Sequence, residues 1–261
     1  MSNRHMVVPD TQVQPGDSFE HLRQAGEYAA EKKPEVIVHL GDHWDMPSLS
    51  TYDKGTRGFE GRRYSDDIAA GIAGMKAFLA PIRAEQKRLR KGNRKRWNPR
   101  MVFLLGNHEY RIERACEKDA MLDGVLGFDD LKLEEMGWEV YPFLEVVNID
   151  GVCYSHYFTS GVMGRPVSSA RAMVTKKMQS CVMGHVQDRD IAYARRADGT
   201  NVTGIFGGIF YPGDQTYLNP QTNASWRGIW MLHDVREGSF DEMPVSMSYL
   251  EKKYAANNSG S

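Results

Sequence analysis

The stretch Glu35-Val36-Ile37-Val38-His39-Leu40-Gly41-Asp42 decides the fold class, because a β-branched apolar run ends abruptly in a glycine and a carboxylate. Such a run is typical of a strand that is buried on both faces of a parallel sheet. A second apolar run lies upstream at residues 5–9, and apolar residues recur at helical spacing over 19–30, after Asp17 or Ser18 as the helix cap. Strand, helix and strand in this order predict a βαβ unit with a parallel sheet.

Downstream of this unit, apolar runs and helical periodicity continue along the chain. Residues 43–64 form a long loop, and a loop of this length inside a compact domain is often functional. We expect one domain over residues 1–254 and a flexible polar tail over 255–261. Helices are predicted over 65–91, up to residue 118, and over 129–136 and 168–178, and strands over 100–105, 138–141, 145–149, 152–155, 180–183, 191–197, 202–210, 227–235 and 243–249.

The composition excludes several classes of protein. The chain has 261 residues, 33 basic and 34 acidic side chains and a net charge of −1, and its 41% hydrophobic and 26% charged residues are ordinary globular values. It lacks the uninterrupted apolar run that a membrane-spanning helix needs, and its first residues lack the apolar core of a secretory signal. Cys116, Cys153 and Cys181 are scattered and odd in number, which argues against a disulfide partner and favours a reducing compartment.

The near-zero net charge conceals one strongly basic segment. Residues 83–100 carry nine basic side chains and one acidic side chain, Glu85. One interpretation is the solvated end of the 65–91 helix and its loop, as most charge runs are. The other is a surface that contacts the phosphate backbone of DNA or RNA, lying beside the site described next. Both interpretations stay open at this point.

Five buried strands end in clusters of side chains that commonly bind metals. In open α/β sheets, ligands bind at the carboxyl ends of the strands, so these clusters are expected to meet. A single cluster is usually an ordinary turn, and a single histidine at a strand end is more often structural than a ligand, but five clusters in one chain argue for a metal site. They are Asp10-Thr11-Gln12, Gly41-Asp42-His43-Trp44-Asp45, Gly106-Asn107-His108-Glu109, Ser155-His156 and Gly184-His185-Val186-Gln187.

The residue types in these clusters suit a two-metal hydrolase. A carboxylate such as Asp42 can bridge two cations, Asn107 can offer an amide oxygen, and His156 and His185 can offer imidazole nitrogens. Two divalent ions held close together bind a phosphate oxyanion and lower the pKa of a bridging water. The residues therefore predict hydrolysis of a phosphate ester.

The blocks from Asp10 to Gln187, in the order D-x-Q, GDxxD, GNHE, H and GHxQ, resemble the calcineurin-like metallophosphoesterase superfamily. The stretch PDTQ…HLGDHWDMPS looks most like members that bacteriophages encode. The resemblance implies an α/β fold, a four-layer α/β/β/α sandwich of two mixed sheets flanked by helices, with the strands after residue 190 in the second sheet. Together with the composition it implies a cytoplasmic protein, in the host cell if the chain is phage-encoded.

The resemblance also implies two metal sites and a residue that acts on the leaving group. His108 would face the scissile phosphate and protonate the leaving oxygen or stabilise its charge. Glu109 would orient His108 or hold the local turn, and Asp45 would support the ligands from outside. The implied metal ligands are Asp10, Gln12 and Gln187 at the first site, Asn107, His156 and His185 at the second site, and Asp42 as the bridge.

The sequence departs from the family pattern at Gln12 and Gln187, where the family usually has histidine. With Asp10 and Asp42, these residues would give the first site oxygen ligands alone, which favour Mg²⁺ or Mn²⁺. We therefore predict two divalent metal ions with Mn²⁺ preferred, and Mg²⁺, Zn²⁺, Fe²⁺ or Ni²⁺ as the alternatives. The other interpretation is that the glutamines do not bind metal and that the first site is labile.

The predicted reaction is attack of a metal-bridging hydroxide on phosphorus, with His108 assisting the leaving group. A phosphodiester is the favoured substrate, as for a nuclease or a nucleotide phosphodiesterase, with DNA or RNA contacting residues 83–100. The alternatives are a phosphomonoesterase, including a protein phosphatase, and a catalytically degenerate protein that binds partners on the same fold. The candidate substrate contacts are Arg62, Arg63, Arg111 and Tyr157.

Overall fold

A six-stranded mixed sheet is the larger of the two main sheets of the protein, which is described here from a computed structural model that covers residues 3–51, 54–213 and 225–255. Four neighbouring strands run parallel, which confirms the predicted βαβ unit, and two antiparallel strands complete the sheet beside the first of them. In spatial order the strands are β13 (Ser239–Ser246), β12 (Gly228–Arg236), β1 (Asn3–Val8), β2 (Val36–His39), β3 (Arg100–Leu104) and β4 (Glu139–Tyr141).

A five-stranded mixed sheet packs against the first. Its three central strands run parallel to one another, and each edge strand pairs antiparallel with its neighbour. A small hairpin of β7 (Thr159–Ser160) and β8 (Arg165–Pro166), which the sequence did not predict, projects beyond it. In spatial order the five strands are β10 (Arg189–Arg195), β11 (Asn201–Gly207), β9 (Cys181–Met183), β6 (Val152–Ser155) and β5 (Val147–Ile149).

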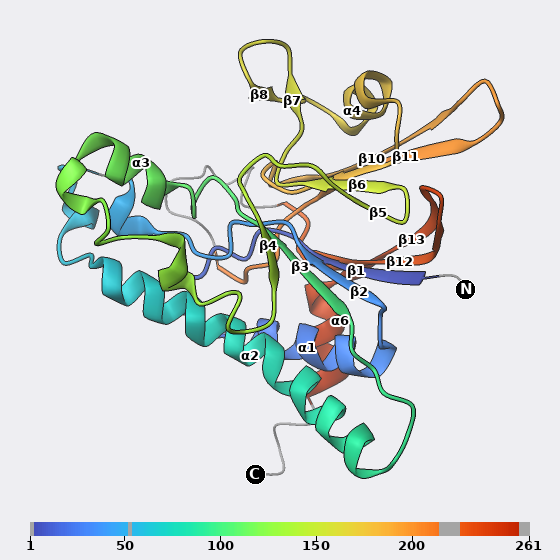
Figure 1. The fold of residues 1–261 in the computed structure, drawn as a ribbon, viewed down its shortest axis with the longest axis horizontal. Helices are drawn as coiled ribbons and strands as arrows, with labels where there is room; N and C mark the ends of the chain where they lie inside the picture. Colours follow the sequence, from blue (N-terminus) through green and yellow to red (C-terminus); the bar gives the residue numbers. More distant parts are fainter. Residues whose placement is uncertain (1–2, 52–53, 214–224, 256–261) are drawn as a thin grey trace.

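Helices cover the outer face of each sheet, so the layers follow the order helices, sheet, sheet and helix (Figure 1). Among the described residues there are five α-helices. Three lie on the six-stranded sheet, one lies on the five-stranded sheet, and the fifth follows β3 at the edge. In that sequence they are α1 (Glu20–Lys32), α2 (Tyr64–Lys91), α6 (Met247–Tyr254), α4 (Ala170–Lys177) and α3 (Arg111–Lys118), and short 3-10 helices occupy η1 (Pro47–Leu49), η2 (Arg57–Phe59), η3 (Ala120–Leu122) and η4 (Phe128–Leu131).

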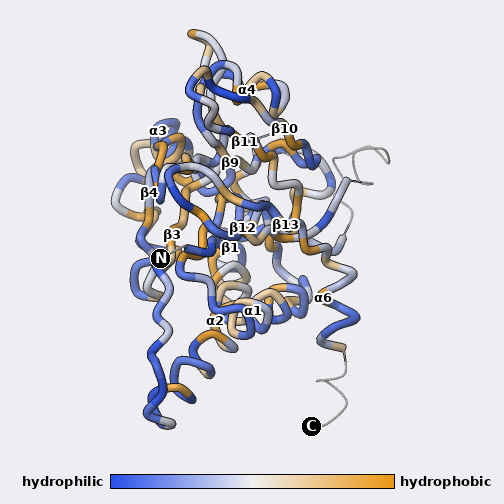
Figure 2. The backbone as a smooth tube through the Cα atoms, turned by 90° about the vertical axis from the view of Figure 1, so that its right-hand side faces the viewer, coloured by the Kyte–Doolittle hydropathy of each residue, from blue (hydrophilic) through white to orange (hydrophobic). Residues whose placement is uncertain are grey.

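Three buried clusters hold the layers together. Successive strand residues point to opposite faces, so Met6 and Ile37 pack on the helices while Val7 and Val38 pack between the two sheets. A third, smaller cluster lies between the five-stranded sheet and α4. In Figure 2 the hydrophobic positions gather where these layers face one another. The mixed α/β architecture with two mixed sheets is therefore the layered arrangement that the sequence predicted.

Several local predictions were wrong. The predicted strand over 243–249 ends at Ser246, whose side chain accepts a hydrogen bond from the backbone N–H of Tyr249 and so begins α6. The predicted helix over 129–136 is reduced to η4 and turns. Helix α1 begins after Phe19 without a side-chain cap, because Asp17 bonds back to Gln14 instead.

The strands after residue 190 do not all join the second sheet. Strands β10 and β11 do so, but β12 and β13 return to the first sheet beside β1. The predicted tail over 255–261 falls almost wholly on residues 256–261, outside the described residues. Among the residues that the structure does cover, no helix is long and apolar enough to cross a membrane.

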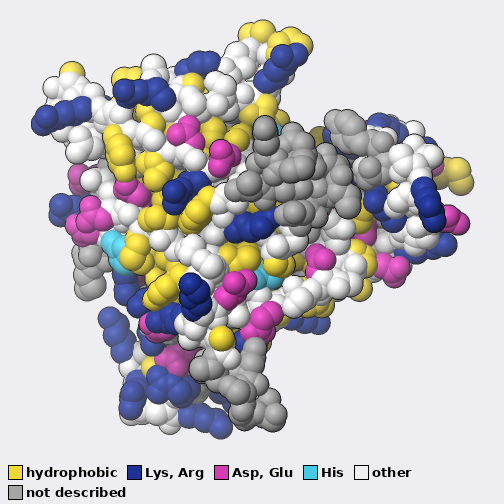
Figure 3. Space-filling model, turned by 180° about the vertical axis from the view of Figure 1, so that it is seen from behind, with side chains coloured by type: hydrophobic (Ala, Val, Ile, Leu, Met, Phe, Trp, Pro, Cys, Tyr) yellow, Lys and Arg dark blue, Asp and Glu magenta, His cyan; other side chains and the backbone are white. Residues whose placement is uncertain are grey.

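The basic segment lies at the edge of the sheet where the parallel strands begin, so the prediction that it adjoins the metal cluster was wrong. Trp97 donates from Nε1 to the carbonyl of Pro34 at 2.8 Å, and Lys33 pairs with Glu85, so the segment contacts the entry to β2. Lys and Arg side chains gather at this corner of the molecule, at the lower left of Figure 3. Six of them are exposed and form no ion pair within the described part of the chain: Lys87, Arg90, Lys91, Arg94, Lys95 and Arg96.

Candidate metal centre

The carboxyl ends of five strands from two sheets meet at one edge of the molecule. Strands β1, β2 and β3 of the six-stranded sheet lead into Asp10, Asp42 and Asn107, and strands β6 and β9 of the five-stranded sheet lead into His156 and His185. The sheets are joined here by direct bonds. The backbone N–H of His185 donates to Asp10 at 3.1 Å, and His156 Nδ1 lies 2.8 Å from the carbonyl oxygen of Leu40.

Three predicted ligands converge closely enough to bind one cation. Ligand atoms of Asp42, His156 and His185 all lie within 4.8 Å of one another. The amide oxygen of Asn107 lies between the two imidazoles, 2.9 Å from His156 Nε2 and 2.6 Å from His185 Nδ1. His156 Nδ1 donates to the carbonyl oxygen of Leu40, which directs Nε2 toward Asn107 and Asp42, and backbone carbonyls orient metal-binding histidines in this way.

Two buried carboxylates stand beside these histidines. Burial and, after it, the negative charge of Asp42 together raise the pKa of Asp10 to about 7. Burial would also raise the pKa of Asp42, but the neighbouring His156 and His108 hold it below its usual range. Burial would lower the pKa of His156, yet Asp42 raises it to about 9. Two acids buried together need positive charge nearby, and a cation would supply it.

The backbone at the centre is strained at three predicted ligands. Gln12, Asp42 and His185 have φ values of 38°, 50° and 63°, in the left-handed region that side chains other than glycine rarely adopt. Such strain persists only where the surrounding structure holds it in place, and it gathers at functional sites. Other described residues, such as Lys33 and Asn93, share this conformation, so the strain accompanies the cluster without being particular to it.

Two glycines allow the backbone to approach the carboxylates. A Cβ atom on Gly106 would lie 2.1 Å from Asp42 Oδ1 and 2.4 Å from the Asp42 backbone nitrogen. A Cβ atom on Gly184 would lie 2.4 Å from Asp10 Oδ1. These distances are shorter than any van der Waals contact, so the glycines of GNHE and GHxQ are required by space.

Glu109 holds the two loops of the bridging region together. Its carboxylate is fully buried and accepts hydrogen bonds from the backbone N–H groups of Asp42, His43, Trp44 and Gly106 at 2.6 to 2.9 Å. Of the two roles expected for Glu109, holding the local turn is the one that these bonds describe. Its contact with three consecutive N–H groups was not predictable from the motif.

His108 is held beside the cluster rather than within it. Its Nδ1 lies 2.8 Å from both the carbonyl oxygen and the Oδ1 carboxylate oxygen of Asp45, while its Nε2 faces Asp42 Oδ2 at 3.8 Å. Burial would lower the pKa of His108, but Asp42 and Asp45 raise it above the ordinary value. Arg111 approaches the same Nε2 at 3.3 Å and donates to the carbonyl oxygen of Asp45 at 2.7 Å. His108, Asp45 and Arg111 are thus brought together as one group.

The two glutamines are placed differently. Gln12 is buried, and its backbone N–H donates to the carbonyl oxygen of Asp42 at 2.9 Å. Gln187 is half-buried, and its amide oxygen accepts a hydrogen bond from the hydroxyl of Tyr211 at 3.3 Å. Both lie on the loops that carry Asp10 and His185, and metal binding by either side chain stays a prediction.

Three aromatic rings form a wall beside the two histidines. Tyr157 packs against His185 with ring centroids 4.6 Å apart, Phe143 packs against Tyr157 at 5.6 Å, and Tyr110 stacks on Phe143 at 5.0 Å. All three rings are half-buried. Tyr157 was a predicted substrate contact. Phe143 and Tyr110 were missed, although the position of Tyr110 directly after GNHE was a signal for it.

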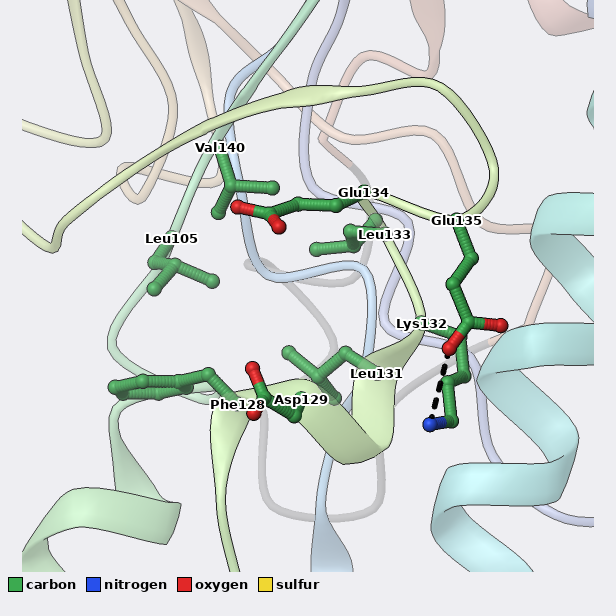
Figure 4. Close-up of a pocket in the computed structure, with 9 residues that line it drawn as sticks. All are labelled: Leu105, Phe128, Asp129, Leu131, Lys132, Leu133, Glu134, Glu135 and Val140. Carbon is green, nitrogen blue, oxygen red and sulfur yellow. Dashed lines mark ion pairs between the residues drawn. The ribbon is translucent and has the colours of Figure 1, made fainter.

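Of the other predicted substrate contacts, Arg111 lies beside His108, whereas the contacts of Arg62 and Arg63 are with their own loop. Arg62 donates to the carbonyl oxygen of Pro47 and lies over the ring of Phe59. Arg63 is exposed and donates to the carbonyl of Arg62. A pocket of about 340 Å³ also lies away from the cluster, against the edge strand β4 and the η4 turn, with Leu105 and Val140 on its wall and an ion pair of Lys132 and Glu135 at its rim (Figure 4).

The chain is similar over part of its length to proteins of two bacteriophages, which agrees with the predicted phage origin. No protein-family model matches the sequence. The Gene 54 proteins of Mycobacterium phage L5 and of Mycobacterium phage D29 are 35% and 34% identical over 83 and 84 residues. Each match spans 32% of this chain and 31% of the relative. A solved structure that is 10% identical aligns with 94% of this chain and 100% of its own, with a TM-score of 0.45.

Proposed function

We propose that this chain is a dinuclear metal-dependent phosphodiesterase of the calcineurin-like metallophosphoesterase type. One observation carries the proposal: five strand ends from two sheets bring Asp10, Asp42, Asn107, His156 and His185 to one buried point, with ligand atoms of three of them within 4.8 Å of one another. His108 lies next to this point without joining it. The order of the motifs along the chain supports the same reading.

The residues present fit a pair of cations. Asp10 and Asp42 are buried at 0% and 1% exposure and repel each other, which raises the pKa of Asp10, and bound cations would relieve this repulsion. The donor set combines carboxylate, amide and imidazole groups, which suits Mn²⁺ and its neighbours in the first transition row. Asp42, Asn107, His156 and His185 would hold one ion, and Asp10, Asp42, Gln12 and Gln187 would hold the other.

The side chains around the two proposed metal sites have separate roles in the proposed reaction. Bound divalent ions would neutralise the phosphate oxygens and lower the pKa of the attacking water. Asp45 holds His108 through Nδ1, so the Nε2 atom is the one that faces the substrate side. Asp42 and Asp45 favour the protonated form of His108 and Arg111 opposes it, and a proton on Nε2 would pass to the leaving oxygen once the substrate replaces Arg111 beside that atom. Glu109 keeps the Asp42 loop in register while this happens.

The test is turnover of synthetic esters by the chelated protein after addition of Mn²⁺, Mg²⁺, Zn²⁺ or Ni²⁺. We expect hydrolysis of bis-p-nitrophenyl phosphate, with slower hydrolysis of mono-p-nitrophenyl phosphate. His108→Ala should lower kcat by about 10² to 10⁴, the usual contribution of a general acid. Asp42→Asn should abolish turnover. His233→Ala, on β12 and away from the cluster, is the matched control and should retain full activity. An absence of turnover with every ion would overturn the proposal.

The metal preference has a test of its own. We expect two ions per chain by calorimetry, with the Gln12 and Gln187 site weaker and selective for Mn²⁺. Gln12→His and Gln187→His should tighten that site and shift its preference toward Zn²⁺, because imidazole suits zinc. If neither substitution changes the affinity or the preference, the glutamines do not bind metal.

A binding protein with a degenerate site is the second candidate. The two glutamines favour it, since they replace the usual histidines of one metal site. The raised pKa of His108 supports the hypothesis of an enzyme, because a binding protein does not need a proton donor beside the cluster. A faster turnover of the monoester than of the diester would favour a phosphomonoesterase instead.

A further inference from the structure

A second pocket opens on the His108 side of the centre. It has a volume of about 250 Å³ and lies between the η1 segment that follows Asp45 and the face of helix α3. One wall is formed by residues 48–51, and the other by Arg111, Arg114 and Lys118. These three residues stand at i, i+3 and i+7, so their side chains line one face of α3.

The lining of this pocket is strongly cationic. Lys54 joins the three basic residues of α3, and Asp119 is the acidic residue of the lining. The carboxylate of Asp119 accepts a hydrogen bond from the backbone N–H of Met121, which directs it to its own turn. Lys54, Arg114 and Lys118 form no ion pair with any residue in the described ranges. Four cations around a small pocket favour an anion of more than one charge.

Arg111 connects the pocket to the reacting groups. Its guanidinium lines the pocket, lies 3.3 Å from His108 Nε2 and donates to the carbonyl oxygens of Asp45 and Met46. Tyr110, directly before it, begins the aromatic wall of Tyr110, Phe143 and Tyr157. The start of α3 therefore brings both cations and partly exposed rings to the centre.

We propose that this cationic pocket binds the phosphate next to the scissile one along a single-stranded nucleic acid, so that the substrate is a polynucleotide rather than a small diester. The inference rests on the proposed phosphodiesterase. Adjacent phosphates of one strand supply the repeated negative charge that the pocket favours, and unpaired bases stack on aromatic rings, which paired bases cannot do.

The test compares two substrates and two double variants. Arg114→Gln with Lys118→Gln removes two cations of the pocket and leaves Arg111 beside His108. Lys95→Gln with Arg96→Gln removes two cations of the remote basic loop and is the matched control. The substrates are an oligothymidylate, which has many phosphates, and bis-p-nitrophenyl phosphate, which has one.

We expect the pocket variant to lower kcat/KM for the oligothymidylate by about tenfold relative to kcat/KM for the single-phosphate ester. The control variant should leave this ratio unchanged. Anisotropy of a labelled oligothymidylate in EDTA should show weaker binding by the pocket variant, and its log–log salt dependence should be shallower by about 1 to 1.5.

Three results would overturn the inference. The first is an equal loss of kcat/KM by the pocket variant with both substrates. The second is an equal or larger loss of kcat/KM for the oligothymidylate in the control variant. The third is that the pocket variant weakens the binding of a nucleoside triphosphate but not the binding of the oligothymidylate. Failure of the proposed function looks different. In that case no ester is hydrolysed with any ion, whereas binding in EDTA still reports whether the pocket holds the strand.

Discussion

The two ends of strands β1, β2 and β3 are built in opposite ways. At the carboxyl ends, charged and polar side chains are buried, and Gly106 and Gly184 leave no room for a Cβ atom beside the carboxylates of Asp42 and Asp10. At the amino ends, charges face water in pairs such as Arg100 with Glu139, or stand alone in the loop after α2. Charged side chains thus fix the positions of the loops at the carboxyl ends of the strands, whereas at the amino ends they form a solvated surface.

The difference teaches where substitutions should matter. A buried acceptor that loses its partner leaves several groups without hydrogen bonds, and this destabilises the fold strongly. An exposed pair is screened by water and contributes little. Matched substitutions at the two ends therefore test whether the ends differ in this way.

The largest effect is expected from Gly106→Ala. The added Cβ would overlap Asp42 Oδ1 and the Asp42 backbone nitrogen, so the free energy of unfolding should fall by about 4 kcal/mol and metal binding should be lost. Gly92→Ala is the control at the other end, since its nearest neighbour would be 3.4 Å away, and it should change stability by about 0.5 kcal/mol or less. Urea unfolding in EDTA measures both, and equal effects would contradict the comparison.

Glu109→Gln should have the next largest effect. The neutral amide offers one oxygen to four backbone N–H groups that Glu109 now satisfies, so the unfolding free energy should fall by about 3 kcal/mol. Glu139→Gln removes the exposed ion pair with Arg100 at the opposite end of β3 and should cost about 1 kcal/mol at most. A Glu109 variant as stable as the Glu139 variant would refute the role assigned to its carboxylate.

The third prediction concerns pH. Burial lowers the pKa of His21 to about 4, and the neighbouring His43 lowers it as well, so the unfolded chain binds this proton more readily than the folded chain. The contribution of neutral His21 to the free energy of unfolding is therefore fully present above about pH 6.5. It is lost as the pH falls toward 4, and the total loss is roughly 3 kcal/mol.

His21→Gln should remove that part of the pH dependence, and His233→Gln on β12 should retain it. The unfolding free energy in EDTA, measured for both variants and the native chain from pH 7 to pH 4, checks this. Parallel curves for the native chain and His21→Gln would show that His21 is not the group responsible.

The smallest effect is expected in the loop after α2. Lys95→Gln with Arg96→Gln removes two exposed cations that pair with no described residue, so the unfolding free energy should change by about 0.5 kcal/mol or less. Thermal unfolding detects a change of that size. A larger loss of stability would show that these cations are structural, and the contrast between the two ends would weaken.

The sequence predicted the centre better than the scaffold that holds it. Asp10, Asp42, Asn107, His156 and His185 were found because each follows an apolar strand, and parallel strands end at the same edge. The return of β12 and β13 to the first sheet was not predictable, because a strand carries no local signal for its distant partner. Phe143 was missed for the same reason, since only the fold brings it to Tyr157.

The basic segment shows the limit of reading charge along a chain. Residues 83–100 are close to GNHE in sequence, and this nearness suggested nearness in space. The length of β3 separates them, because the segment enters the strand and the motif leaves it. The prediction failed at α6 for another reason. The residues of this segment suit a strand, but Tyr254 and Lys253 bond to Glu31 on α1, and these tertiary contacts favour the helix.

The residues of the candidate centre are divided between two sheets, so the packing between the sheets sets the distance between the imidazoles and the carboxylates. Asp10, Asp42 and Asn107 are fixed to one sheet, and His156 and His185 to the other. The separation of the sheets is set by side chains such as Trp230, whose Nε1 donates to the carbonyl of Gly207 across the gap. A change of one methylene in that layer should move the imidazoles relative to the carboxylates, so the packing between the sheets sets the geometry of the cluster at their edge.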